Sequence, residues 1–133
     1  TERAFIEVCK NMNREYSVMN VDDSSSRTYE DFKLYFETHK SGYFVAYRDS
    51  IAASIVNAAT DSGLRVPEDV EVLSLIGTKY ANIVRPTLTS MHIDMIDVGR
   101  RSMYMLIDLM KNELETKTYR IESTYDKRES TKE

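Results

Sequence analysis

The chain alternates short β-forming runs with segments of helical periodicity, and this alternation restricts its fold more than any other feature. Helical periodicity fills four segments, at about 1–14, 25–39, 49–62 and 94–112. The β-forming runs lie at 16–21, 41–47, 70–76, 88–93 and 119–125. Because the two kinds of element alternate with short connections, the sequence predicts an α/β fold with an open, mostly parallel, doubly wound sheet and helices on both faces.

Local signals mark the ends of two of these helices. Asp49 or Ser50 can cap the third helix, which Gly63 stops and Pro67 prevents from continuing. Asp94 can cap the last helix, in the same way that Ser25 or Ser26 can cap the second. The last helix is expected to bury one apolar side, formed by Met95, Val98, Ser102, Met105, Leu106 and Leu109.

Two further features of the helices carry packing predictions. Gly99 lies inside the last helix, where glycine is unfavourable, so close backbone packing is expected there. The second helix carries an aromatic stripe at helical spacing, and burial against the sheet is favoured over a role as a ligand platform. The stripe consists of Tyr29, Phe32, Tyr35 and Phe36.

The composition indicates one globular domain and excludes several kinds of protein. A chain of 133 residues with 41% hydrophobic and 30% charged residues is typical of a single soluble domain. No apolar run reaches the roughly 20 residues that a membrane-spanning helix needs. The net charge of −4 argues against direct binding of nucleic acid by this segment, and the single Cys9 favours a reducing compartment.

The sequence offers little that resembles a catalytic or metal site. His39 and His92 have no Ser, Cys or carboxylate at a spacing that suggests a triad, and the four glycines form no phosphate-binding loop. We therefore expect no enzyme, no cofactor and no bound metal. Open α/β sheets without such residues usually bind ligands at the carboxyl ends of their strands.

Two strand ends are candidates for that binding edge. Tyr47, Arg48 and Asp49 follow the strand 41–47, and Ile76 to Lys79 follow the strand 70–76. Polar side chains there can reach a ligand while the sheet stays rigid. For Asp49 the alternative, that it only caps the following helix, remains open.

Several motifs, in order along the chain, resemble those of one known family. They are RAF at 3–5, RDSIA at 48–52, GLRVPEDVEVLS at 63–74, RPTLTSM at 85–91, DVGRR at 97–101 and YDKREST at 125–131. Together they resemble the second half of the effector domain in the lactose-repressor/galactose-repressor family of bacterial transcription regulators.

The resemblance implies a type I periplasmic-binding-protein-like fold, of which residues 1–133 form the C-terminal lobe as a single domain. It implies that the helix-turn-helix headpiece and the N-terminal lobe of the family lie outside this chain. The expected function is effector binding and dimerisation in a cytoplasmic repressor. A sugar, sugar phosphate or related metabolite binds between the lobes, and a homodimer reaches operator DNA through its headpieces.

The candidate effector edge departs from the family pattern. Arg48 stands where the family has a ligand-contacting Asn, Ile76–Gly77 replaces an acidic or amide pair, and Ser74 replaces a Gly. Ile76 cannot accept hydrogen bonds from sugar hydroxyls, whereas the forked guanidinium of Arg48 suits a phosphate or carboxylate. These departures predict an anionic effector or the loss of the usual sugar contacts.

The resemblance also implies a dimer interface, with plain core packing of the same residues as the alternative. Its predicted members are Ala53, Val56, Ile83, Val84, Pro86 and Leu88. An alternative function is a sugar-binding protein of a transport system with the same fold. An enzyme of the doubly wound type is a third, less favoured interpretation.

Overall fold

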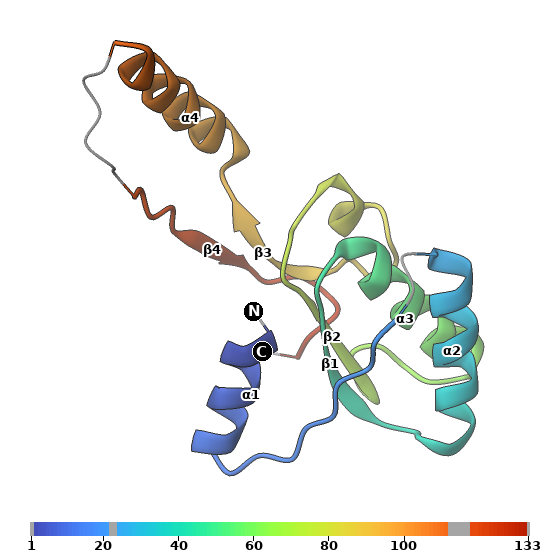
Figure 1. Ribbon diagram of the computed structural model, residues 1–133. Helices are drawn as coiled ribbons and strands as arrows, with labels where there is room; N and C mark the ends of the chain where they lie inside the picture. The colour runs from blue at the N-terminus through green and yellow to red at the C-terminus, as the bar shows by residue number, and fades with distance from the viewer. Residues whose placement is uncertain (1, 22–23, 112–117, 133) are drawn as a thin grey trace.

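The elements of the chain form a four-stranded sheet with helices beside it (Figure 1). The computed structural model describes residues 2–21, 24–111 and 118–132. The elements in chain order are α1 (Glu2–Asn11), α2 (Ser25–Thr38), β1 (Gly42–Ala46), α3 (Asp49–Asp61), β2 (Val70–Ser74), the 3-10 helix η1 (Lys79–Asn82), β3 (Thr89–Ile93), α4 (Met95–Met110) and β4 (Ser123–Asp126). The strand order is β1-β2-β3-β4, with the first two pairings parallel and the last antiparallel. The predicted open, mostly parallel α/β fold is confirmed.

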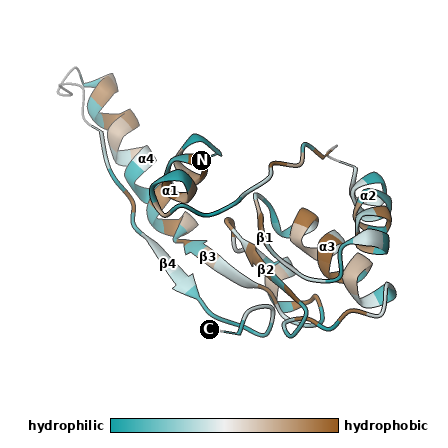
Figure 2. Ribbon diagram, turned by 90° about the horizontal axis from the view of Figure 1, so that it is seen from below, coloured by the Kyte–Doolittle hydropathy of each residue, from teal (hydrophilic) through white to brown (hydrophobic). Residues whose placement is uncertain are grey.

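One face of the sheet is tightly packed. Helices α2 and α3 pack together over it (Figures 1 and 2); α3 contacts β1 and β2, and α2 reaches β1 through its aromatic rings. The predicted aromatic stripe is at the centre of this core, since Phe36 is 0% exposed and Phe32 is 3% exposed. The ring of Phe44 from β1 lies edge-on to Phe32, with the ring centroids 5.7 Å apart.

Helix α1 stands on the other side of the sheet from α2 and α3 (Figure 1). Helices therefore lie on both sides, as predicted, yet α1 buries none of its residues. On that side β1 leaves Tyr43 82% exposed and Val45 45% exposed. The sheet thus has one closed face and one open face.

The end of α3 confirms its sequence signals. Gly63 adopts a φ of +77°, a conformation that is strained for residues with a side chain. Its N–H donates to the carbonyl of Thr60, and the N–H of Leu64 donates to the carbonyl of Ala59. These two bonds complete the Schellman motif that stops the helix.

The start of α2 and the segment before it differ from the prediction. Helix α2 begins at Ser25, so the N-cap position falls on Ser24 rather than on Ser25 or Ser26. The predicted strand at 16–21 is wrong, because this segment forms no ladder with any strand among the described residues. It lies across a groove from β1 instead, and β-propensity alone cannot form a strand without a hydrogen-bonded neighbour.

Ser130 bridges β2 and β3 by hydrogen bonds where the two strands separate. These strands pair directly only at Leu73–Thr89 and Ser74–Ser90. Before that point the N–H of Ser130 donates to the Thr87 carbonyl, and its carbonyl accepts from Val72 N–H. Its Oγ donates to the Val72 carbonyl at 2.6 Å and accepts from Thr89 N–H at 2.8 Å. The fully buried Ser130 therefore acts as a one-residue strand between β2 and β3.

Helix α4 stands away from the rest of the molecule, at the end of β3 (Figure 1). The predicted cap is confirmed, since the Asp94 carboxylate accepts from the N–H groups of Ile96 and Asp97. The predicted buried side is wrong in this chain, because α4 has no buried residue. Nothing lies within 4 Å of a Cβ built on Gly99, so the expected close packing there is absent among the described residues.

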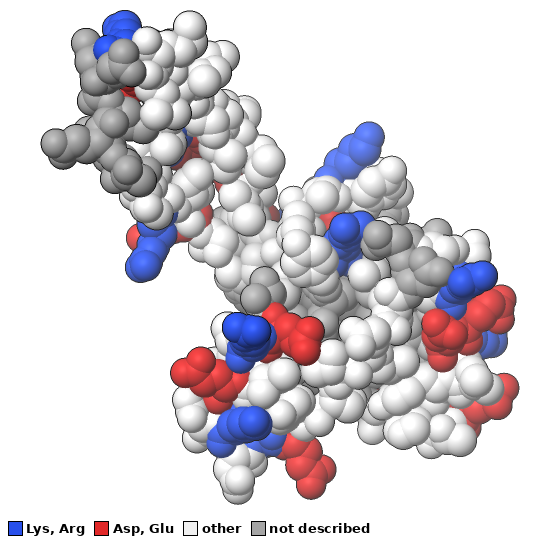
Figure 3. All heavy atoms as spheres, in the orientation of Figure 1, with Lys and Arg blue, Asp and Glu red and all other residues white. Residues whose placement is uncertain are grey.

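The exposed surface of α4 is largely apolar. Figure 3 shows that most of its visible surface carries neither Lys or Arg nor Asp or Glu. Its large hydrophobic side chains that are more than half exposed are Met95, Ile96, Met103, Tyr104, Leu106, Leu109 and Met110. An amphipathic helix with this surface normally packs against a partner.

Candidate functional site

The carboxyl ends of β1 and β2 form one edge of the sheet. The two strands are parallel neighbours, with Ala46 beside Ser74 at their last paired position. The residues that follow them, 47–49 and 75–79, therefore leave the sheet side by side. This is the edge at which open α/β sheets bind ligands.

Asp49 fastens the two strand ends together. Its side chain is 2% exposed, and Oδ2 accepts hydrogen bonds from both N–H and Oγ1 of Thr78, each at 2.6 Å. The N-cap position of α3 is Arg48, so the interpretation of Asp49 as a helix cap is wrong. The buried Oδ1 has no hydrogen-bond partner among residues 2–21, 24–111 and 118–132, so this edge contains an unsatisfied acceptor.

Gly77 holds the second strand end against β3. Its N–H donates to the Met91 carbonyl at 2.7 Å. A Cβ added at Gly77 would lie 2.6 Å from Ser90 Oγ and 3.0 Å from the Met91 carbonyl oxygen. A side chain at position 77 would therefore collide with Ser90 of β3 unless that residue shifts.

Tyr47 and Arg48 line a large open groove of about 1290 Å³. The groove is lined by β1, by α1 with residues 14–21, and by residues of α2 and α3. Tyr47 is 52% exposed, and the Arg48 guanidinium lies 5.8 Å from the centre of its ring. Arg14 supplies a second guanidinium to the same groove, and Glu2 and Glu15 contribute carboxylates.

The four predicted effector residues therefore lie at one edge of the sheet, but they have different roles there. Tyr47 and Arg48 face the groove, whereas Ile76 is half-buried and does not line it. Asp49 is mainly a structural link to Thr78. Sequence reasoning placed Thr78 at this edge but missed its bond to Asp49, because the two residues lie 29 positions apart and no local pattern marks the pair.

The predicted dimer-interface residues divide into two groups. Val56 and Leu88 are 0% exposed and belong to the core, so their side chains offer no surface to a second copy. That part of the interface prediction is corrected in favour of core packing. The remaining four keep some exposed surface, and they are Ala53, Ile83, Val84 and Pro86.

Glu129 holds Thr87, the residue that directly follows Pro86. Its carboxylate accepts from the N–H and Oγ1 of Thr87, each at 2.8 Å. These bonds lower the pKa of Glu129 below its ordinary value. Arg85 donates to the carbonyls of Asn82 and Val84, so the turn after η1 is held from within.

The described residues contain neither a membrane-spanning helix nor a metal-binding cluster. No helix in that part of the chain is long and apolar enough to cross a membrane. No group of three His, Cys, Asp or Glu side chains there is placed to hold a metal ion.

Sequence comparison identifies similar proteins. The family model described as a periplasmic binding protein-like domain matches residues 1–131. The HTH-type transcriptional regulator pepR1 of Lactobacillus delbrueckii subsp. lactis is 35% identical over 96 residues, which are 71% of this chain and 28% of that protein. Catabolite control protein A of Priestia megaterium is 35% identical over 81 residues, or 61% of this chain and 24% of that protein. The chain thus spans about a quarter of the length of these relatives.

Solved structures agree with the sequence matches. The transcription regulator CcpA of Lactococcus lactis has a TM-score of 0.84 and 26% identity, covering 96% of this chain and 48% of that one. A LacI family regulator from Arthrobacter sp. FB24, in complex with lactose, has a TM-score of 0.89 and 23% identity, covering 98% and 50%. The lac repressor dimer bound to operator and the anti-inducer ONPF has a TM-score of 0.86 and 19% identity, covering 97% and 46%.

Proposed function

The chain belongs to the family of periplasmic binding protein-like domains, and on that premise we propose that it is the C-terminal lobe of an effector domain. The whole protein would be a DNA-binding repressor of the lactose-repressor/galactose-repressor family. Its helix-turn-helix headpiece and N-terminal lobe would lie outside these 133 residues. The relatives that are regulators span about four times the matched length, which supports this division.

The observation that carries the proposal is the uncovered apolar surface of α4. Helix α4 leaves the body on β3, and the chain returns on β4. Met95, Met103 and Met110 on this helix are each more than half exposed. We expect the N-terminal lobe to cover this surface, because a contiguous apolar helix face is otherwise costly to hydrate.

We infer that the effector contacts the edge formed by Tyr47, Arg48 and Asp49. The guanidinium of Arg48 suits a phosphate or carboxylate, because it can donate two parallel hydrogen bonds. Asp49 contributes indirectly, because its buried carboxylate is bonded to Thr78 and fixes the two strand ends side by side. A sugar phosphate or another acidic metabolite satisfies the requirement at Arg48.

We propose a homodimer in which Ala53, Ile83, Val84 and Pro86 contribute to the contact between copies. Effector binding would change the angle between the two lobes, and this would change the spacing of the headpieces on operator DNA. The effector acts as a switch only if it binds one lobe arrangement better than the other. We expect the protein to act in the cytoplasm, where operator DNA is accessible.

The relatives do not favour the alternative of a sugar-binding protein for transport. Relatives that this chain matches include a transcriptional regulator and catabolite control proteins. They are also not enzymes, which agrees with the prediction that this chain has no catalytic function. Reading the gene upstream of this segment for a helix-turn-helix tests the choice between a regulator and a transport protein.

The effector class is tested by thermal shift of the protein that contains this chain. We expect glucose 6-phosphate, used as a probe of a phosphorylated sugar, to raise the unfolding temperature more than glucose does. Arg48→Gln should remove that difference, whereas Lys79→Gln, a matched loss of one exposed charge at the same edge, should preserve it. Binding of neutral hexoses or pentoses at micromolar strength, with no response to acidic ligands, would show that the anionic assignment is wrong.

A further inference from the structure

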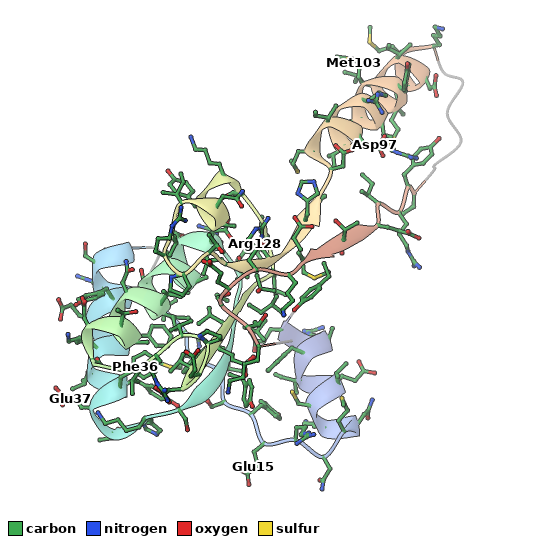
Figure 4. The ribbon with its side chains drawn as sticks, turned by 180° about the vertical axis from the view of Figure 1, so that it is seen from behind. Glu15, Phe36, Glu37, Asp97, Met103 and Arg128 are labelled. Atoms are coloured by element: carbon green, nitrogen blue, oxygen red, sulfur yellow. The ribbon has the colours of Figure 1, made fainter. Side chains whose placement is uncertain are left out.

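The molecule narrows sharply where α4 leaves the body. Strand β3 runs out toward α4, and β4 returns beside it in antiparallel register, with Ser90 opposite Asp126 and Ile93 opposite Ser123. In Figure 4, Arg128 lies at the base of this two-stranded stalk, and Met103 lies far out on α4. The stalk therefore sets the direction in which α4 projects.

Arg128 joins the two strands at that base. Its Nη1 donates to the Leu88 carbonyl and to Ser90 Oγ, each at 2.8 Å, just before and within β3. Its Nη2 donates to Asp126 at 3.1 Å, at the end of β4. The backbone N–H of Arg128 donates to Thr89 Oγ1 at 3.0 Å. One side chain, only 20% exposed, thus fixes both strands at the point where they leave the sheet.

The same base is in contact with the candidate effector edge. Ser90 Oγ, which accepts from Arg128, is the nearest atom to the position where Gly77 would carry a Cβ. Gly77 N–H donates to the carbonyl of Met91, the next residue of β3. Gly77 is followed by Thr78, which is bonded to Asp49 at the start of α3. A continuous series of contacts therefore runs from the effector edge to the base of the stalk.

We propose that Arg128 is a positioning residue that holds the stalk angle and couples it to the effector edge. This inference rests on the proposed function, because the stalk angle matters only if α4 carries a second lobe. A shift of residues 76–78 on effector binding would move Ser90 against Arg128. The Arg128 guanidinium would then transmit the movement to Asp126, and Asp126 would transmit it to β4.

The geometry requires a guanidinium in particular. The Arg128 fork reaches a carbonyl, a hydroxyl and a carboxylate on two strands at once. A lysine ammonium is a single point charge on a flexible stem and cannot hold these three acceptors in fixed directions. We therefore expect Arg128→Lys to loosen the stalk even though the charge is kept.

The alternative is that Arg128 only stabilises the fold, as Ser130 does close by. The two residues lie two positions apart, and both bond to β3. They differ in what they join, because Ser130 connects β3 to β2 inside the body and Arg128 connects β3 to β4 in the stalk. This difference supplies a matched control.

The test measures distances between spin labels in the protein that contains this chain, with no ligand present. Labels are placed at Glu37→Cys on α2 and Met103→Cys on α4, in a Cys9→Ser background; both positions are exposed. We expect Arg128→Gln to widen the distance distribution roughly twofold, with Arg128→Lys in between. Ser130→Ala should lower the unfolding midpoint and leave the width unchanged.

An unchanged width in both Arg128 variants, or an equal widening in Ser130→Ala, would overturn the proposal. If Arg128→Gln does not fold, the Lys variant decides between these outcomes. Because the experiment contains no effector, its failure is distinct from failure of the ligand test at Arg48.

Discussion

Replacing Ser130 by alanine should destabilise the chain far more than the loss of one hydroxyl suggests. The Ser130 Oγ donates to the Val72 carbonyl and accepts from Thr89 N–H, and all of these groups are buried between β2 and β3. The variant keeps the backbone hydrogen bonds of residue 130, so β2 and β3 remain connected there. It leaves the Val72 carbonyl without its donor and the Thr89 N–H without its acceptor, at a position that water does not reach.

The magnitude follows from the cost of each orphaned group. An unsatisfied buried backbone group costs about 1–3 kcal/mol, so the two together cost about 2–6 kcal/mol. Domains of this size are stable by only about 5–15 kcal/mol, so the change is a large share of the total. We expect the free energy of unfolding in urea, followed by circular dichroism at pH 7, to fall by that amount with an unchanged m-value.

Ser102→Ala is the matched control. Ser102 Oγ donates to the Val98 carbonyl on the exposed surface of α4, where water replaces the lost partner. We expect a change within about 0.5 kcal/mol there. A loss below about 1 kcal/mol in Ser130→Ala, or equal losses in the two variants, would refute the account of Ser130 as a buried link between strands.

Four other substitutions test separate parts of the structure. Gly77→Ala should lower the free energy of unfolding in urea by about 1–3 kcal/mol, because the new methyl group collides with β3. Gly99→Ala should raise the same free energy by up to about 1 kcal/mol, because nothing lies near that position in α4. Equal effects of the two substitutions would contradict the steric argument. Phe36→Ala should cost about 3–5 kcal/mol in the same assay, and a loss under about 1 kcal/mol would mean that Phe36 is not at the centre of the core. Hydrogen bonds from Arg65 lower the pKa of Asp69 from 3.8 to about 2. The stability that the Asp69 carboxylate contributes is therefore complete above pH 3.8 and is lost as pH falls toward about 2. Asp69→Asn should flatten the decline in unfolding temperature over that pH window, and an unchanged slope would count against the ion pair.

The parts of the fold that were predicted correctly have local causes. The stop of α3 at Gly63 and the cap of α4 at Asp94 each depend on bonds within a few residues. The burial of Phe32 and Phe36 follows from helical spacing of large aromatic side chains. Each of these features is encoded within one turn or one helix, so a single sequence is sufficient to predict them.

The parts that were mispredicted depend on distant partners. The segment 16–21 has a strand pattern, but a ladder also needs an adjacent edge within hydrogen-bond reach. Asp49 stands at a helix start and resembles a cap, although its partner is Thr78. Val56 and Leu88 are apolar in the sequence whether they face a core or a second copy, and only the packed structure separates the two cases.

For α4 the apolar pattern was predicted correctly and its burial was not. The helix has the expected cap and amphipathic surface, but the described chain offers nothing for that surface to pack against. Periodicity predicts that a helix has an apolar side; it does not say which part of a protein covers it.

The position of β1 at the rim of the sheet has a practical consequence for the purified chain. Its five residues include neither a proline nor a charged side chain, and Tyr43 and Val45 project from it into solvent. Within the described ranges no strand pairs with its outer rim. Such a rim can template pairing with a second molecule, so concentrated solutions of the isolated segment should form β-rich aggregates, and a lysine at position 45 should delay their appearance.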